Sequence, residues 1–324
     1  MTKAIRIHQP GGPDVLKWED IDVPAPAAGE IQIRQTAVGL NYIDVYHRTG
    51  FYPSPLPFTP GLEAAGVIEV LGTGVTNFKI GDRVTYATGP LGAYAQARVM
   101  PADRLVKIPD RITDQQAAAM MLQGMTVEYL IRRTYTVKPG DTILVQAAAG
   151  GVGLILCQWA KHLGATVIGT VSSDEKAALA RANGCDYPIV YTREDFHARV
   201  MEITNGAKVP VVYDSVGRDT FAKSLDCLAP LGVMALFGQA SGPVPPFDLG
   251  QLAAKGSLFI TRPTLFTYTA KRADLEATAA ALFDVVGSGA VKISVNQTYP
   301  LSEAGTAHRD LEARRTTGST VFTV

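Results

Sequence analysis

Hydrophobic and polar positions change their period along the chain, and this change predicts two structural regions. Over residues 1 to about 110, short runs of β-favouring residues are separated by Gly and Pro clusters, as at 31–34, 65–70 and 83–86. Such runs are typical of short strands joined by tight turns. The first region is therefore predicted to be a small, irregular, β-rich domain.

Beyond Asp141, apolar strand-like runs alternate with helical stretches. The runs are TILVQA, TVIGTV, PVVYDSV, VMALFG and LFIT. This alternation is the pattern of βαβ units, in which each helix carries the chain back to the start of a parallel neighbouring strand. The second region is predicted to be an α/β domain with a doubly wound parallel sheet.

Helical patterns join these regions. Thr113 lies three residues before Gln116, which is the spacing of a capping box, and it opens the Ala/Met-rich run AAAMML. A second helical pattern covers residues 126–135. These helices are predicted to connect the two domains.

The C-terminal tail has its own pattern after about Pro263. It predicts an amphipathic helix over 275–286, a strand in KISVNQTYPL and a last helix near 304–314. We expect this tail to return to the first domain. The predicted domains are then residues 1–124 with 264–324, and residues 125–263.

Composition narrows the possible classes of protein. Hydrophobic residues make up 47% of the 324 residues, enough for sizeable cores, and 30 basic residues balance 30 acidic ones. No global field therefore favours nucleic acid or an anionic membrane. Because the chain has no membrane-length apolar stretch and no signal-peptide core near its start, we expect a cytoplasmic protein.

The cysteines do not form a recognisable framework. Cys157, Cys185 and Cys227 are far apart and lack CxxC spacing, which argues against disulfides and against a zinc knuckle. We expect all of them to be reduced, buried packing residues.

A glycine-rich turn joins the strand TILVQA to the helix predicted over 154–163. Gly150 and Gly151 would let the backbone approach a pyrophosphate, and Gly153 would permit close packing of the helix on the strand. Ala148 stands where the usual motif has its first glycine. Since unpaired N–H groups at a helix start attract phosphate, this turn is predicted to bind a dinucleotide.

The residues about 20 positions later favour NADPH over NADH. Enzymes that bind NAD usually present an acid there, whereas this chain has Ser172, and Lys176 can add positive charge near a 2′-phosphate. Alternatively, Ser172 caps the next helix with Glu175 closing a capping box. Asp174 either opposes the phosphate or serves the helix dipole.

The order of motifs along the whole chain resembles the medium-chain dehydrogenase/reductase superfamily, and within it the quinone oxidoreductase branch that includes zeta-crystallin. The motifs are GGPDVL, GLNYID, PGLEAAG, GDRV, AAAGGVG and YDSVG. Where zinc-dependent relatives carry a cysteine this chain has Asn41, and where they carry GHE it has Gly61-Leu62-Glu63. The four-cysteine zinc lobe is also missing, so we predict no metal.

This resemblance implies a GroES-like catalytic domain, a Rossmann domain and a cofactor in the cleft between them. It also implies a homodimer joined through the last strand of the Rossmann sheet, within residues 256–262. Matching positions place NADPH contacts around the nicotinamide, ribose, pyrophosphate and adenosine. The implied contacts are Asn41, Tyr46, Thr126, Gly150, Gly151, Val152, Gly153, Ser172, Lys176, Tyr191, Ser215, Phe237, Gly238, Ser241 and either Arg314 or the adjacent Arg315.

A zinc-free site suits a quinone better than an alcohol. Without a Lewis acid, alcohol oxidation lacks stabilisation of the alkoxide, whereas a quinone is already electrophilic and mainly needs orientation and exclusion of water. We therefore predict NADPH:quinone oxidoreductase activity. Asn41 and Tyr46 would position the nicotinamide and donate to the acceptor oxygen, with Tyr52 and Gln123 as further pocket residues.

Two other functions remain open. One is reduction of an activated C=C bond in an enone or enoyl thioester, which uses the same hydride geometry. The other is a structural or RNA-binding role for an NADPH-binding protein, since some relatives are lens proteins or bind RNA. Arg132, Arg133 and Lys138 form a basic cluster, although such a run usually forms a solvated helix face.

Overall fold

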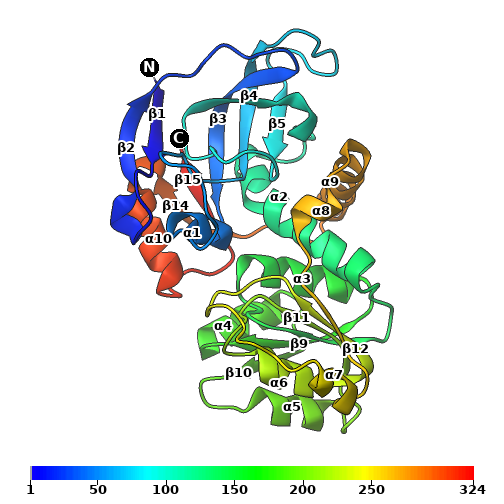
Figure 1. The fold of residues 1–324 in the computed structure, drawn as a ribbon. Coiled ribbons are helices and arrows are strands. Elements are labelled where there is room, and N and C mark those ends of the chain that lie inside the picture. The colour runs from blue at the N-terminus through cyan, green and yellow to red at the C-terminus, as the bar shows by residue number, and fades with distance from the viewer. Residues whose placement is uncertain (1) are drawn as a thin grey trace. The chain divides into compact units, whose positions relative to one another are not determined.

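The computed structural model describes residues 2–324, and the chain divides into two compact units (Figure 1). The first unit contains Met1–Met125, Tyr268–Gly287 and Ile293–Val324, and the second contains Thr126–Thr267 and Ser288–Lys292. The tail thus belongs mostly to the first unit. One short segment, Ser288–Lys292, belongs to the second, where the Gln158 side chain hydrogen-bonds the backbone of Lys292.

The first unit is built on a seven-stranded sheet and a two-stranded ribbon. The sheet order is β14-β15-β3-β4-β5-β7, with β6 also paired to β3, and only β14 and β15 are parallel. Its core consists of apolar side chains such as Ile33, Ile68 and Phe322. The strands are β1 (Thr2–Arg6), β2 (Lys17–Ile21), β3 (Glu30–Leu40), β4 (Ala64–Leu71), β5 (Arg83–Tyr86), β6 (Ala97–Pro101), β7 (Val106–Lys107), β14 (Val295–Pro300) and β15 (Ser319–Thr323).

Helix α2 (Asp114–Tyr129) crosses the boundary between the units along the chain. The capping box is confirmed: the Thr113 hydroxyl accepts from the Gln116 N–H at 3.1 Å, and the Thr113 N–H donates to Gln116 Oε1 at 3.0 Å. The separate helix predicted from 126 is wrong, because α2 runs through it and ends in a π-helical turn, Leu130–Thr134. Gly124 does not interrupt the helix, since it packs closely against Leu282.

The remaining helices of the first unit are short or lie in the tail. They are α1 (Tyr42–Arg48), α9 (Arg272–Gly287) and α10 (Ala304–Glu312), while α8 (Leu265–Tyr268) spans the boundary. The tail helices and strand appear where the sequence predicted them. Their ends differ by a few residues, as is usual for helix termini.

The second unit contains a six-stranded parallel sheet with the order β10-β9-β8-β11-β12-β13. Taken in chain order this is 3-2-1-4-5-6, the Rossmann arrangement, so the predicted doubly wound sheet is confirmed. Tyr187–Val190 is a strand that the sequence analysis did not identify. The strands are β8 (Thr142–Val145), β9 (Thr166–Val171), β10 (Tyr187–Val190), β11 (Val209–Asp214), β12 (Leu228–Leu236) and β13 (Phe259–Thr261).

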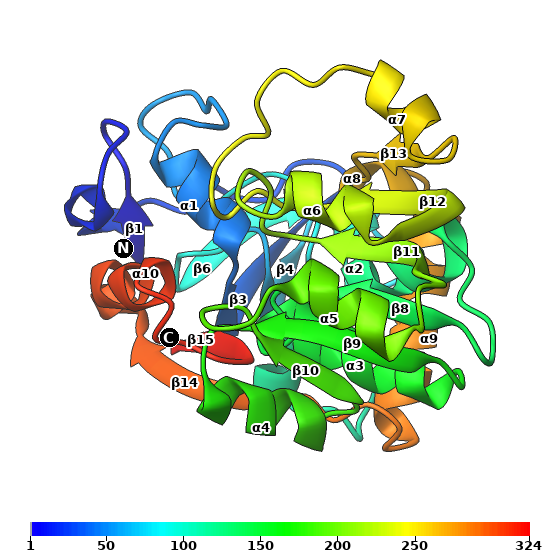
Figure 2. The ribbon, with the colours of Figure 1, turned by 90° about the horizontal axis from the view of Figure 1, so that it is seen from below.

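Helices flank this sheet in two contacting pairs, α3 with α4 and α5 with α6 (Figure 2). Apolar side chains from the strands, such as Leu144, Val212 and Met234, form the core. The strand order reverses between β8 and β11, and their carboxyl ends mark the place where Rossmann sheets bind ligands. The helices are α3 (Gly151–His162), α4 (Asp174–Ala182), α5 (Phe196–Ile203), α6 (Phe221–Asp226) and α7 (Gly250–Ala254).

Two further expectations concern cysteines and membrane spans. Cys157, Cys185 and Cys227 are all free and buried, as predicted. Among residues 2–324, no helix has the length and apolar character needed to span a bilayer.

Candidate active site

The turn after β8 meets the start of helix α3. Gly150 is the N-cap residue, and the Leu154 N–H donates to its carbonyl at 2.9 Å, so α3 begins three residues earlier than predicted. The N–H groups of Gly151, Val152 and Gly153 therefore lie in the first helical turn, which has no intrahelical acceptors for them. Such a turn can accept a phosphate.

Gly153 is required by the close approach of α3 to the turn. A Cβ at this position would lie 2.4 Å from the Ala147 carbonyl oxygen and 2.7 Å from the Ala148 carbonyl carbon. At Gly150 a Cβ would meet only the Ala147 oxygen, at 3.3 Å. The backbone cradle at the start of α3 therefore fits a pyrophosphate, and it depends on the absence of a side chain at 153.

Ser173, and not Ser172, caps helix α4. The Ser173 hydroxyl accepts from the Lys176 N–H at 3.3 Å, and its backbone is extended at φ −152°. The alternative in which Ser172 caps the helix is therefore wrong by one residue. Since Tyr191 N–H donates to the Val171 carbonyl at 3.1 Å, the end of β10 lies beside the end of β9, and Tyr191 lies near Ser172.

Arg193 is a residue that the sequence analysis missed. Its guanidinium pairs with both oxygens of Asp174, with one N–O distance of 2.7 Å. This hydrogen-bonded pair holds the pKa of the Asp174 carboxyl below its usual range. The acid beside the predicted phosphate site is thus matched by a cation from the loop after β10, which a basic residue following that strand could have indicated.

Residues at the ends of β11 and β12 form another part of the second unit's site. A Cβ on Gly238 would lie 2.5 Å from the Ser215 carbonyl oxygen, which places these two residues in contact. The Ser241 hydroxyl donates to the Val216 carbonyl at 2.8 Å and accepts from the Asp219 N–H at 3.0 Å. Ser241 is therefore already engaged locally. Phe237, partly exposed, follows β12 directly, and Thr126 is buried on α2.

In the first unit, Asn41 is the N-cap of α1 and is only 5% exposed. Its Nδ2 donates to Glu63 Oε2 at 2.6 Å, and its Oδ1 accepts from Gln123 Nε2 at 3.3 Å. The structure thus brings Asn41 and Gln123 together, as the predicted pocket requires. In the sequence, Glu63 appeared only within the PGLEAAG motif and the Gly61-Leu62-Glu63 run, without a role of its own.

Aromatic rings gather around Tyr46 on α1. The Tyr46 ring centroid lies 5.3 Å from that of Tyr52 and 5.4 Å from that of Tyr42, and the Tyr52 N–H donates to the Tyr46 carbonyl at 3.0 Å. Phe51 completes the cluster and is 45% exposed. Edge-to-face contacts of this kind hold Tyr46 and Tyr52 together on one rigid platform.

The structure distinguishes the two adjacent arginines of the tail. Arg315 pairs with Asp310 at 2.9 Å. Arg314 instead lowers the pKa of the Tyr42 phenol, although burial and the Glu312 charge raise that pKa overall. This interaction places Arg314 near Tyr42, and the choice between the two arginines as the cofactor contact stays a prediction.

Two buried carboxyl groups, those of Asp44 and Glu63, accept hydrogen bonds from Asn41. Burial raises the pKa of Asp44 to about 7 and that of Glu63 to about 8, despite hydrogen bonds that lower both. Tyr94 donates to Asp44 at 2.9 Å and contacts His308 Nε2 at 3.1 Å. No local sequence pattern connects these residues, because Tyr94 and His308 lie 214 positions apart in the chain.

The other ring nitrogen of His308 contacts a buried arginine, whose charge is balanced by an ion pair. Arg48, 1% exposed, binds Glu312 at 2.8 Å and His308 Nδ1 at 3.1 Å. Burial and the Arg48 charge lower the pKa of His308 to about 3, so its imidazole is neutral. A neutral ring can accept from Arg48 on one nitrogen while its other nitrogen faces Tyr94.

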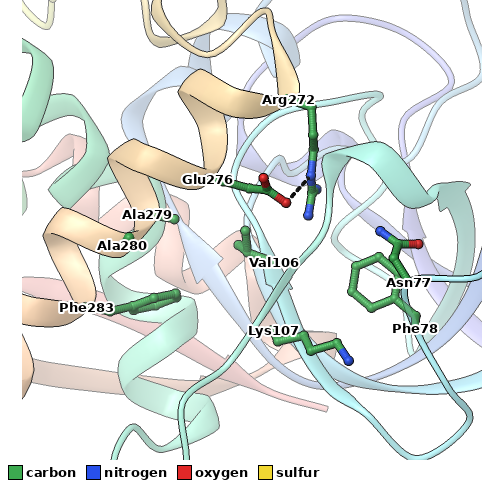
Figure 3. A pocket seen from close by; sticks show the side chains of 9 residues that line it. All are labelled: Asn77, Phe78, Val106, Lys107, Arg272, Glu276, Ala279, Ala280 and Phe283. Atoms are coloured by element: carbon green, nitrogen blue, oxygen red, sulfur yellow. Dashed lines mark hydrogen bonds and ion pairs between the residues drawn. The ribbon is translucent and has the colours of Figure 1, made fainter.

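A shallow pocket of about 300 Å³ lies elsewhere in the first unit, between α9 and β7 (Figure 3). Apolar side chains including Phe78, Val106 and Phe283 line it. The Arg272 guanidinium at its rim is paired with Glu276 at 2.8 Å. None of the predicted site residues lines this pocket.

Comparison with known proteins identifies the family. Residues 27–110 match the family described as alcohol dehydrogenase GroES-like domain, and residues 151–292 match the family described as zinc-binding dehydrogenase. The quinone oxidoreductase of Pseudomonas aeruginosa is 53% identical over 323 residues, which cover 99% of each chain. The chain belongs to the quinone oxidoreductases of the medium-chain dehydrogenase/reductase superfamily. The predicted resemblance and fold class are thereby confirmed, and the protein is an oxidoreductase.

Two further relatives bear on chemistry. The structure of Escherichia coli quinone oxidoreductase complexed with NADPH is similar with a TM-score of 0.98 at 48% identity, covering 99% of this chain and all of that one. The 2-haloacrylate reductase of a Burkholderia species is 48% identical over 330 residues, or 99% of each chain. The family therefore contains at least two kinds of reductase.

The name of the second matching family mentions zinc. By the family resemblance, Asn41 and Leu62 stand at positions where zinc-dependent relatives carry ligands, and neither an amide nor a leucine side chain is a usual zinc ligand. Within residues 2–324, no three His, Cys, Asp or Glu side chains are grouped so that they could hold a metal ion.

Proposed function

We propose that this protein is an NADPH:quinone oxidoreductase. The observation that carries the proposal is the full-length identity of about half to enzymes named for this activity, together with a TM-score of 0.98 to one of them in complex with NADPH. When bound, NADPH supplies the hydride that reduces the acceptor. The chain's own residues bind the cofactor, orient the acceptor and handle a proton.

The second unit binds the dinucleotide. The N–H groups at the start of α3 bind the pyrophosphate, and Gly153 keeps the turn close to the helix. Ser172, Lys176 and Tyr191 recognise the adenosine 2′-phosphate, and Arg193 neutralises Asp174 beside them. Ser215, Phe237, Gly238 and Ser241, with Thr126 and Arg314, complete the predicted contacts.

The first unit acts on the acceptor. Asn41 retains one amide N–H after donating to Glu63, and this N–H can donate to an acceptor oxygen on which negative charge develops. Tyr46, held by Tyr52, donates from its hydroxyl and delivers the proton that the reduced quinone takes up. Gln123 orients Asn41 and is not a direct contact in this scheme.

The test compares acceptors and variants. We expect NADPH to be oxidised by benzoquinones and naphthoquinones with kcat/KM well above that for a simple 2-enone, and faster than NADH is oxidised. Y46F and N41A should each lower kcat for the quinone by about 10²-fold or more, and each should also raise the Kd for NADPH, since both residues are predicted to contact the nicotinamide. Unchanged turnover in both variants would refute the residue assignment, and no quinone turnover by the wild type would refute the function.

Reduction of an activated C=C bond is the second candidate. It is favoured by the 48% identity over the full chain to a 2-haloacrylate reductase. The same acceptor panel, extended to 2-chloroacrylate and a 2-enone, distinguishes the candidates. A higher kcat/KM for these substrates than for any quinone would replace the quinone assignment.

RNA binding has less support from the structure. Arg132 and Arg133 in the predicted basic cluster both pair with Glu128, at 3.8 and 3.0 Å. Their charge is therefore partly compensated within the protein. Retention on RNA that weakens steeply with salt would be needed to support that role.

A homodimer and a cytoplasmic location belong to the same proposal. Strand β13 is an edge strand of the parallel sheet, and its Phe259 is 58% exposed, so a second copy can extend the sheet at this edge. Three free cysteines suit a reducing compartment. Light scattering should give a dimer for the wild type and a monomer for F259K, and cell fractionation tests the location.

A further inference from the structure

A chain of buried polar side chains links distant parts of the first unit. Ser319 Oγ lies 2.7 Å from Gln123 Oε1, Gln123 Nε2 lies 3.3 Å from Asn41 Oδ1, and Asn41 Nδ2 lies 2.6 Å from Glu63 Oε2. Each of these residues is at most 7% exposed. They come from β15, α2, the N-cap of α1 and the residue before β4, so direct side-chain contacts link four separate elements of the first unit.

One end of this chain has a fixed hydrogen-bond direction. Glu63 Oε1 accepts from the Leu122 N–H at 2.8 Å, and a backbone N–H can only donate. If Glu63 is ionised, its Oε2 also only accepts, so Asn41 must present its NH₂ to Glu63 and its oxygen to Gln123. Gln123 must then present its NH₂ to Asn41 and its oxygen to the Ser319 hydroxyl.

The other end permits the opposite direction. Ser319 Oγ also lies 2.7 Å from the Ala119 carbonyl oxygen. If Glu63 Oε2 carries a proton, it can donate to the Asn41 oxygen, and both amides can turn over. Gln123 then donates to Ser319, which donates its own proton to Ala119. Each link of the chain of hydrogen bonds then keeps a donor and an acceptor in either direction, although the turned Asn41 amide gives up its capping-box contact with the Asp44 N–H.

We propose that Glu63 is a positioning residue that sets the direction of this chain and thereby decides which end of the Asn41 amide faces the acceptor. With Glu63 ionised, Asn41 offers an N–H to the acceptor oxygen; with Glu63 protonated, it offers a carbonyl oxygen that opposes developing negative charge. This inference rests on the proposed role of Asn41 in reducing a carbonyl acceptor.

The surroundings of Glu63 make both protonation states accessible near neutral pH. Burial raises the pKa of Glu63 to about 8, and the Asp44 charge adds to this rise. The other titratable groups that sense Glu63 are Tyr86 and Tyr94, both buried phenols whose pKa is raised, mainly by burial. Glu63 and Asp44 are therefore the groups that can change charge in this region between pH 6 and 9.

E63Q is the direct test, since it keeps the volume and the hydrogen-bonding capacity but removes the charge that fixes the direction. In the wild type we expect kcat for a quinone to rise as the pH passes through about 8. In E63Q we expect no such rise, with kcat at pH 9 on the order of tenfold or more below the wild type and an unchanged Kd for NADPH. A purely structural role would lower stability without altering the pH profile.

D44N provides a second variant should E63Q fail to fold. Removing the Asp44 charge should move the rise in kcat to lower pH, because that charge raises the pKa of Glu63. The inference is overturned if E63Q keeps the wild-type profile and kcat, or if D44N leaves the midpoint in place. If the wild type reduces an enone but no quinone, the proposed function fails, and the same profiles measured with the enone still test Glu63.

Discussion

Asp44 in the first unit and Asp214 in the second are both fully buried, yet their surroundings differ. Asp214 accepts four hydrogen bonds: from the N–H groups of Val216 at 2.7 Å and Gly217 at 3.0 Å, and from the hydroxyls of Thr220 at 2.6 Å and Ser224 at 3.0 Å. Both of its oxygens are therefore satisfied.

Asp44 accepts only through Oδ2, from the Asn41 N–H at 2.9 Å and the Tyr94 hydroxyl at 2.9 Å. Its Oδ1 is buried and has no hydrogen-bond partner in the described part of the chain. A fully satisfied buried network rigidifies a fold, whereas a partly satisfied one keeps unused capacity at a cost in stability. The comparison teaches that Asp214 holds a loop in place, while Asp44 and its neighbours remain free to change protonation.

The largest expected effect is on stability, and it comes from replacing Asp214, but not Asp44, by its amide. D214N turns one acceptor into a donor that faces existing donors, and we expect it to lower the free energy of unfolding by about 3 kcal/mol. D44N leaves its NH₂ without an acceptor at the Oδ1 position but also removes a buried charge, so we expect the smaller change of about 1 kcal/mol. Urea unfolding at pH 7.5 measures both, and equal losses would remove the distinction between the two networks.

Variants of the glycines between β8 and α3 test whether this rigid part of the second unit binds the cofactor. G153A forces a Cβ to within 2.4 Å of the Ala147 oxygen, so the turn must move. We expect NADPH affinity to fall about 100-fold, together with a loss of stability of about 1–3 kcal/mol. G150A is the matched control for the packing effect, since its Cβ meets the same oxygen only at 3.3 Å, and urea unfolding should find its stability within about 1 kcal/mol of the wild type.

The pH dependence of the free energy of unfolding tests the partly satisfied network around Asp44 and Glu63 in the first unit. Folding raises the pKa of Asp44 to about 7 and of Glu63 to about 8, so the folded state binds more protons than the unfolded state at neutral pH. Stability is then fully present below the unfolded values and is lost as pH rises through the folded ones, with a slope of up to about 1.4 kcal/mol per pH unit for each acid.

This measurement is cleanest between pH 7.5 and 8.5, which brackets the Glu63 pKa of about 8. His308, whose pKa is lowered to about 3 on folding from an ordinary 6.5, has the opposite effect, and that effect is nearly complete about one pH unit above 6.5. We expect stability to decline over the interval in the wild type and to decline less in E63Q. A steeper decline in E63Q, or none in the wild type, would contradict the raised pKa values.

The smallest effect is expected at the exposed pair of Asp174 and Arg193. R193A leaves the Asp174 charge unbalanced beside the predicted 2′-phosphate site, and we expect the Kd for NADPH to rise about two- to fivefold while that for NADH stays constant. The double variant D174N/R193A should restore most of the affinity. A loss that is equal for both cofactors, or insensitive to salt, would separate this pair from phosphate recognition.

Several features of this protein follow from the sequence alone because they depend on near neighbours. The alternation of apolar runs and helices predicted the parallel sheet, and the Thr113 capping box formed as expected. The Asp214 network is also local, since its farthest partner, Ser224, is 10 positions away. Adjacent candidates were harder to distinguish: the backbone conformation at 173, not residue type, selected Ser173 over Ser172 as the cap of α4.

The polar interior of the first unit was decided only by tertiary structure. Glu63 lies 22 positions from Asn41, and Ser319 lies 196 positions from Gln123, so no local pattern signals that they share one chain of hydrogen bonds. The sequence alone indicated that Asn41 stands where zinc-dependent relatives carry a cysteine, and that Glu63 is the last residue of the run that matches their GHE motif. Only folding brings Asp44, His308 and Ser319 into the same hydrogen-bonded interior. Burial sets the charge of the titratable groups there, and burial is a property of the packed sheet and not of any one segment.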